Sequence, residues 1–187
     1  MSQRHTDEDD RLLDAARACV LAVGVRRTTV TDVARKAGVS RMTLYRRFPD
    51  LEGVLSALMT REFGRLVAGA AAQAQGANTR ERLVATVVHG SRALVADPLF
   101  GRLLDVDPEL LLPYVTQRLG GMQKMAVEAS VRILADADDS VRTDATPEAL
   151  AAGMELIARG FVLASHGELA LDPWAELARA IDGYLRP

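Results

Sequence analysis

Apolar residues recur at spacings of three and four along most of the chain, which is the pattern of helices with one buried face. No stretch alternates between apolar and polar residues with the period of two that a strand requires. Pro147 after Thr146 and Pro173 after Asp172 stand where a proline follows an N-cap at the start of a helix. The pattern predicts an all-α fold with helices at residues 6–23, 29–38, 40–48, 50–74, 79–96, 98–105, 108–116, 117–135, 146–166 and 172–185.

Two of these helices are short and follow each other closely. Thr29 opens a capping box, and Gly38 is suited to the left-handed residue that ends a helix. Ser40 is a good N-cap for the next helix, which must stop near Phe48 because Pro49 follows. The sequence therefore predicts two short helices joined by a tight turn.

These two helices carry the residues of a helix-turn-helix at the required separations. Such a motif needs a small residue where the helices pack, a turn residue that tolerates positive φ, and an apolar anchor on the second helix. Ala34, Gly38 and Leu44 meet these three needs. Val33 and Val39 add apolar contacts around them.

The outward face of the second short helix has the composition of a helix that enters the major groove of DNA. With ~100° per residue, Met42 and Arg46 point almost directly away from Leu44, which faces the core. Arg46 is suited to base edges, and Met42 and Thr43 are suited to adaptable contacts. Flanking side chains suited to backbone phosphates are Ser40, Arg41, Tyr45 and Arg47.

Charge is distributed unevenly along the 187 residues. Residues 26–47 carry seven arginine or lysine side chains and one carboxylate, a net charge of +6, in a chain whose formal net charge is −2. Residues 1–25 are acidic instead. A basic block favours a polyanionic partner, because each phosphate that it neutralises releases condensed counterions. The alternative is a solvated helix face without a partner.

The run from Thr29 to Asp50 resembles the DNA-binding segment of the TetR family, the tetracycline-repressor-like regulators. The resemblance extends over residues 11–59 and is sharpest at Thr-Leu-Tyr-x-x-Phe-Pro, residues 43–49. It implies an N-terminal three-helix DNA-binding domain at residues 1–50 and a C-terminal helical domain for ligand binding and dimerisation at residues 51–187. It also implies DNA contacts, and the positions concerned are Thr29, Thr31, Ser40, Arg41, Met42, Thr43, Tyr45, Arg46 and Arg47.

Two positions depart from the family pattern. Leu51 stands where family members often have a lysine that holds a phosphate, so that contact is absent or comes from a neighbouring arginine. Met42 replaces a residue that is frequently small, and it either holds the backbone farther from the groove or contacts a thymine methyl group.

A homodimer is expected, because one short recognition helix buries too little surface for tight specific binding. The resemblance places the interface on the last two helices. The candidate interface residues are Gly153, Ile157, Gly160, Ala164 and Gly167 on one helix, and Trp174, Leu177 and Ile181 on the other. Either stripe could instead be intrachain core.

The resemblance also implies a cavity for a small-molecule effector among the middle helices. Candidate wall residues are His89, Phe100, Leu104, Met122, Met125 and Phe161, and plain core packing is the alternative for each. The mechanistic hypothesis is that the ligand tilts the long helix after Asp50, changes the spacing of the recognition helices and releases a repressor from a palindromic operator. The sequence does not distinguish a repressor from an activator.

Other classes of protein find little support in the sequence. Cys19 is the single cysteine, no cluster has zinc spacing, and the aspartate-rich residues 136–145 lack the glycine and glutamate of a calcium loop, so neither a metal nor a cofactor is expected. Known catalytic motifs are absent, which argues against an enzyme. Neither a secretory leader nor an apolar run of ~18 residues is present, and a cytoplasmic protein away from membranes is expected. The rival hypothesis is a helical module that binds a small molecule or a protein and does not read DNA.

Overall fold

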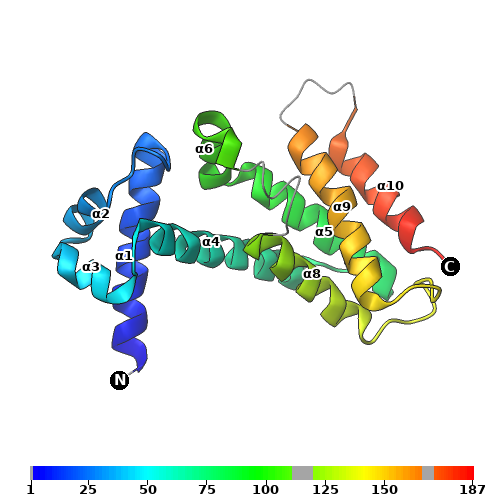
Figure 1. Cartoon of the computed structure of the whole chain (residues 1–187). Helices are drawn as coiled ribbons and strands as arrows, with labels where there is room; N and C mark the ends of the chain where they lie inside the picture. The colour runs from blue at the N-terminus through cyan, green and yellow to red at the C-terminus, as the bar shows by residue number, and fades with distance from the viewer. Residues whose placement is uncertain (1, 111–119, 166–170) are drawn as a thin grey trace. The chain divides into compact units, whose positions relative to one another are not determined.

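The computed structural model describes residues 2–110, 120–165 and 171–187, and for residues 2–7 and 110 the backbone alone. These residues form helices joined by turns and loops. Within these ranges no strand occurs, and the prediction of an all-α fold is confirmed. Figure 1 shows the helices in chain order. They are α1 Ser2–Val23, α2 Val30–Ala37, α3 Arg41–Arg47, α4 Leu51–Gln73, α5 Thr79–Ala96, α6 Pro98–Val106, a 3-10 turn Pro108–Leu110, α8 Gly121–Leu134, α9 Pro147–Ala164 and α10 Pro173–Leu185.

Helix starts follow local capping chemistry closely. The side chains of Thr146 and Asp172 accept hydrogen bonds from backbone N–H groups of the first turns of α9 and α10, and a proline follows each cap. Helix α5 has the predicted bounds, whereas α1 begins four residues earlier than predicted. Of the helix predicted at 108–116, the described part is the 3-10 turn, and the rest lies outside the described residues.

The chain forms two compact units. One comprises Met1–Glu62 with Asp97–Gln117, and the other comprises Phe63–Ala96 with Arg118–Pro187. The long helix α4 therefore contributes to both. The predicted functional division at residue 50 stays a prediction, because packing units need not coincide with DNA-binding and ligand-binding parts.

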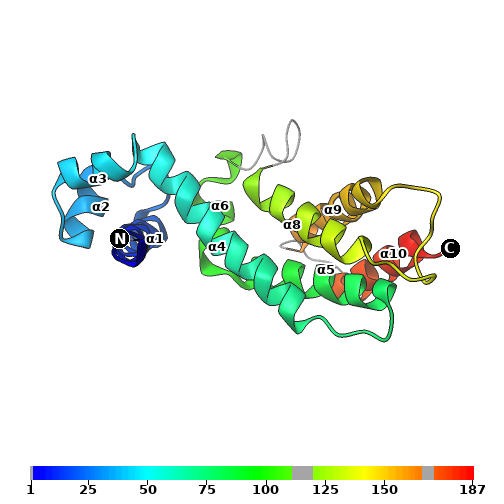
Figure 2. The ribbon, with the colours of Figure 1, turned by 90° about the horizontal axis from the view of Figure 1, so that it is seen from below.

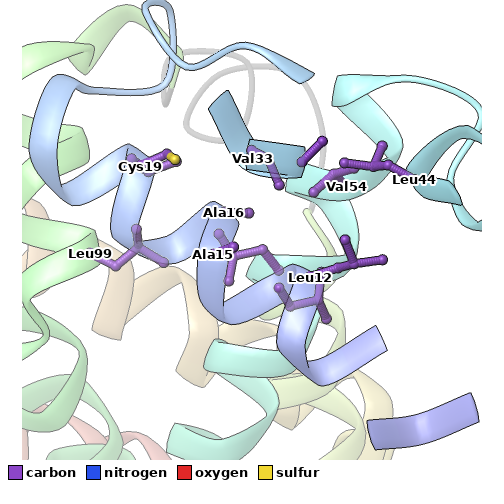
Figure 3. Close-up of a cluster of buried hydrophobic side chains, with 12 residues drawn as sticks. Leu12, Ala15, Ala16, Cys19, Val33, Leu44, Val54 and Leu99 are labelled. Atoms are coloured by element: carbon purple, nitrogen blue, oxygen red, sulfur yellow. The ribbon is translucent and has the colours of Figure 1, made fainter. Parts of the chain in front are cut away.

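In the first unit, α1 supplies the surface on which the other helices pack. Leu12, Ala16 and Val20 are fully buried on one stripe of α1. Around this stripe lie side chains of α2, α3, α4 and α6, which Figure 3 shows gathered with it. The members drawn from these helices are Val33, Ala34, Leu44, Val54, Leu58 and Leu99. Cys19 lies on the same stripe and burial raises its pKa, so it serves as a small apolar side chain.

In the second unit, the core forms where α5, α8, α9 and α10 meet. Leu83 of α5 and Met154 of α9 are buried against Leu177 and Ile181 of α10. Figure 2 shows α8 and α9 side by side in this unit. Leu177 and Ile181 therefore pack within the chain, whereas Trp174 of the same stripe is only partly buried. A dimer contact by the α10 stripe stays a prediction.

No single helix among the described residues is long and apolar enough to cross a membrane. The bent pair of α5 and α6, taken together, has the length and composition of a span.

A buried carboxylate fixes the turn between α1 and α2. Asp107, which caps the end of α6, accepts a hydrogen bond from the Val25 N–H at 2.7 Å. The chain passes Asp107 closely because Gly24 has a φ of +86°, and a Cβ at Gly24 would lie 2.8 Å from both Asp107 Oδ2 and Val106 Cγ1. This contact joins residues 82 positions apart.

We predict that Asp107→Ala lowers the free energy of unfolding by about 1–3 kcal/mol, because the Val25 N–H loses its buried acceptor. Asp107→Asn keeps an acceptor oxygen and should lose less. Urea titration followed by circular dichroism at fixed protein concentration measures both. Equal midpoints for Asp107→Ala and the wild-type chain would contradict this role.

A second carboxylate fixes the loop after α8 to the start of α5. Asp138 accepts hydrogen bonds from the Ser140 hydroxyl and from the Thr79 N–H at 3.0 Å, and the Thr79 hydroxyl accepts from the Asp138 N–H. These bonds, the one from Ser140 first, lower the pKa of Asp138 from 3.8 to about 2. The ionised carboxylate therefore stabilises the folded chain.

Because the pKa is lower in the folded state, this stabilisation is present above about pH 4 and disappears as the pH falls through about 2. We expect Asp138→Asn to melt below wild type at pH 7, with the difference in melting temperature shrinking between pH 4 and pH 2. Thermal unfolding across this pH range measures the difference. A difference independent of pH would refute the assignment.

Candidate nucleic-acid interface

Helix α2 is positioned by reciprocal bonds at its start and a left-handed residue at its end. The Thr29 hydroxyl accepts the Asp32 N–H at 3.1 Å and donates to the Asp32 carboxylate at 2.5 Å. Gly38 has a φ of +70°, and the turn that it makes lets the Val39 N–H donate to the Ala34 carbonyl at 3.0 Å. Gly38 is needed for its backbone conformation, since a Cβ there would meet no atom within 4 Å.

Helix α3 is anchored to the core by one apolar side chain. Leu44 is fully buried among residues of α1, α2 and α4. The Ser40 hydroxyl accepts the Thr43 N–H at 3.1 Å and lies 3.0 Å from the Thr43 hydroxyl, which closes the first turn. At the other end, Phe48 packs against the same core and has an extended backbone, so the helix ends before Pro49.

The opposite side of α3 presents large side chains to solvent. Met42 is 76% exposed and Tyr45 is 46% exposed. Arg41 and Arg46 are exposed beside them. Thr43 is half-buried, with its hydroxyl at the cap. We call Arg41, Met42, Tyr45 and Arg46 the α3 face.

The structure turns Arg47 toward α1. Its side chain is 16% exposed, it donates a hydrogen bond to Glu8 at 2.8 Å, and its Nε lies 3.5 Å from Asp9 Oδ1. The hydrogen bond to Glu8 raises the pKa of the guanidinium, which therefore stays charged. A phosphate contact by Arg47 stays a prediction, and it would require exchange of these carboxylates.

Other members of the basic block also have partners within the chain. Arg26 pairs with Glu109 at 2.8 Å, and Arg35 pairs with Asp32 at 2.6 Å. Lys36 is exposed on α2. Thr29 and Thr31, predicted near a phosphate, are both exposed. The net charge of the block therefore overstates the charge that it offers to a partner.

Comparison with known proteins decides the family. The sequence profile described as "Bacterial regulatory proteins, tetR family" matches residues 12–58. An HTH-type transcriptional regulator of Mycobacterium tuberculosis is 33% identical over 191 residues, which cover 99% of this chain and 98% of that protein. The chain belongs to the TetR family. It is accordingly a DNA-binding transcriptional regulator.

Solved TetR-family structures share the fold over nearly the whole chain. The transcriptional repressor QsdR of R. erythropolis superposes with a TM-score of 0.72 at 19% identity, covering 95% of this chain and 94% of that one. The repressor AlkX of a Dietzia strain gives 0.66 at 22% identity, with 93% and 92% covered. At these identities the likeness shows the fold.

The residues predicted for a TetR-family dimer interface are divided by the structure. Gly160 and Ala164 are exposed on α9, whereas Ile157 packs on the core and Leu177 and Ile181 are fully buried. Trp174 is half-buried, with Arg92 over its ring at 6.0 Å. Gly167 lies outside the described residues.

Gly153 serves a contact within the chain. The Tyr184 ring of α10 lies over it so closely that a Cβ at Gly153 would be 2.1 Å from the Tyr184 hydroxyl. The large exposed apolar side chains of α9 are Leu156, at 61%, and Leu163, at 36%. Neither leucine is among the predicted interface residues, although the two are seven residues apart, like the glycines.

The residues predicted for a TetR-family effector cavity also fall into separate groups. Phe100, which is buried, and Leu104, which is half-buried, belong to α6 in the first unit. The other four belong to the second unit: Met122 and Met125 of α8, Phe161 of α9 and His89 of α5. Met122, Met125 and Phe161 are half-buried, and His89 is exposed.

An open groove of about 410 Å³ lies between α5 and α10. Apolar and charged side chains both line it, and the lining residues are Glu81, Val84, Ala85, Val88, His89, Ala178, Arg179 and Asp182. His89 is the member of the predicted cavity set that lines it. The effector residues stay a prediction.

Proposed function

We propose that this TetR-family regulator is a repressor that binds a palindromic operator as a homodimer and dissociates from it when a small molecule binds. The observation that supports DNA reading best is the α3 face, which projects arginine, tyrosine and methionine side chains from a helix anchored by buried Leu44. The relatives QsdR and AlkX are described as repressors, which supports repression.

Each side chain of the α3 face suits a different part of a DNA duplex. Arg46 can donate two hydrogen bonds to guanine O6 and N7, and Met42 can contact a thymine methyl group. Arg41 and Tyr45 can reach phosphates on either side. The Thr31 hydroxyl is a further proposed phosphate donor near the start of α2. The Thr29 hydroxyl donates to Asp32, and the Ser40 and Thr43 hydroxyls bond to each other, so phosphate contacts by these three would require exchange of those bonds.

A second copy of the chain is the proposed partner of the exposed face of α9. Leu156, Gly160 and Leu163 lie on one side of this helix, because they are four and three residues apart. Single exposed leucines are ordinary on a protein surface. Here two leucines on one face offer apolar contact, and the glycine between them lets another helix approach closely. Pairing would present two recognition helices to half-sites about 34–36 Å apart.

An effector that binds the second unit would control operator binding if it bound one conformation of the protein more tightly than another. A tenfold loss of operator affinity needs about 1.4 kcal/mol of such coupling. Helix α4 contributes residues to both units without a break, and it is the proposed carrier of the change. Met122, Met125 and Phe161 are the proposed wall residues in the second unit.

DNA reading is tested by selecting bound sites from a random duplex library. The expected result is a palindrome whose half-sites are one helical turn apart, bound with a steep salt dependence. Arg46→Ala should weaken binding to the selected site by about 1–3 kcal/mol per half-site and relax one base position. Arg132→Ala removes the same charge from an exposed position of α8 and should leave affinity unchanged. Absence of binding at low salt would favour the rival module that does not read DNA.

The dimer interface is tested with Leu156→Glu, which places a carboxylate on the proposed contact. We expect its dimer dissociation constant to rise at least about tenfold, or ~1.4 kcal/mol, as measured by sedimentation equilibrium. Leu171→Glu is the matched control, since Leu171 is 50% exposed and lies outside α9. If both variants dimerise like the wild type, the interface lies elsewhere.

A further inference from the structure

The carboxylates at the start of α1 are divided between two arginines. Glu8 and Asp9 bind Arg47 of α3, at 2.8 and 3.5 Å. Asp10 and Asp14 bind Arg61 of α4, at 3.0 and 2.8 Å. The acidic segment that the sequence places before the basic block is therefore in direct contact with it.

The two arginines differ in what surrounds them. Arg61 is largely buried and also pairs with Glu62, which in turn pairs with Arg17, so this set ties α1 to α4. Arg47 follows Arg46 at the end of the recognition helix and is thus next to the α3 face. Its partners remain open to water, with Glu8 at 38% and Asp9 at 41% side-chain exposure.

The contact with Arg47 is incomplete on the side of Asp9. Asp9 Oδ1 is buried and accepts no hydrogen bond from any described residue, and Arg47 Nε approaches it only to 3.5 Å. A guanidinium binds carboxylate and phosphate through the same paired N–H donors. A DNA phosphate can therefore take the place of the carboxylates at the same N–H groups of Arg47.

We propose that Glu8 and Asp9 set the DNA affinity of this protein by competing with backbone phosphates for Arg47. The inference depends on the proposed function, since it concerns the same recognition helix. In the free protein the carboxylates neutralise Arg47, so Arg47 adds little to the attraction of arbitrary duplex DNA. Non-specific binding, which rests on phosphate contacts alone, is thereby weakened.

The proposal is tested with the double variant Glu8→Gln/Asp9→Asn, measured by fluorescence anisotropy on a labelled random-sequence duplex over a range of salt concentrations. We expect binding about threefold to tenfold tighter than wild type, as for release of one partly exposed ion pair on each subunit. We also expect the slope of log affinity against log salt to steepen by about 0.9 for each Arg47 that gains a phosphate.

The same two substitutions in an Arg47→Gln background separate this mechanism from a general charge effect. There they should change affinity by less than about twofold, because the competing guanidinium is gone. Glu128→Gln/Glu148→Gln removes the same charge from exposed positions of α8 and α9 and should leave the affinity unchanged. Thermal unfolding establishes that each variant folds.

Three results would overturn the proposal. An equal gain in both backgrounds would show that the carboxylates act only through their long-range field. A loss of affinity in the double variant would show that the pair merely positions α3. Failure of the wild-type chain to bind any duplex at low salt would instead remove the proposed function, and this inference with it.

Discussion

The α3 face depends on the burial of Leu44. Helix α3 has seven residues, and a helix of that length is not stable in water by itself. Full burial of a leucine stabilises a fold by about 1.5–3 kcal/mol, and burial of Leu44 holds α3 against α1, α2 and α4. Because Leu44 faces inward, Met42 and Arg46 must face outward. The anchor therefore determines which residues a partner meets.

The features that the sequence predicts depend on interactions between residues that are close together in the chain. The caps at Thr29, Ser40, Thr146 and Asp172 use hydrogen bonds that span two or three residues, so a short window of sequence contains the whole interaction. The direction of each α3 side chain follows from helical periodicity in the same way. The family resemblance then joined these local features to a fold and to a DNA-binding function.

What the sequence could not predict depends on residues far apart in the chain. Arg47 was expected to bind phosphate because its position on α3 allowed it, yet its partner Glu8 is 39 residues away. The spacing of the glycines in α9 indicated a smooth face, but only the packing of α10 shows that Gly153 is covered by Tyr184. Periodicity shows that a face is apolar. Only the fold shows which helix covers it.

The close fit around Gly24 makes position 24 the less replaceable half of this contact. A side chain there would meet both the Asp107 carboxylate and Val106 Cγ1, and the φ of +86° disfavours any residue with a Cβ. Asp107, 83 positions later, is constrained by the hydrogen bond that it accepts from Val25. In the lineage of this regulator position 24 is therefore expected to keep its glycine even where another acceptor replaces Asp107.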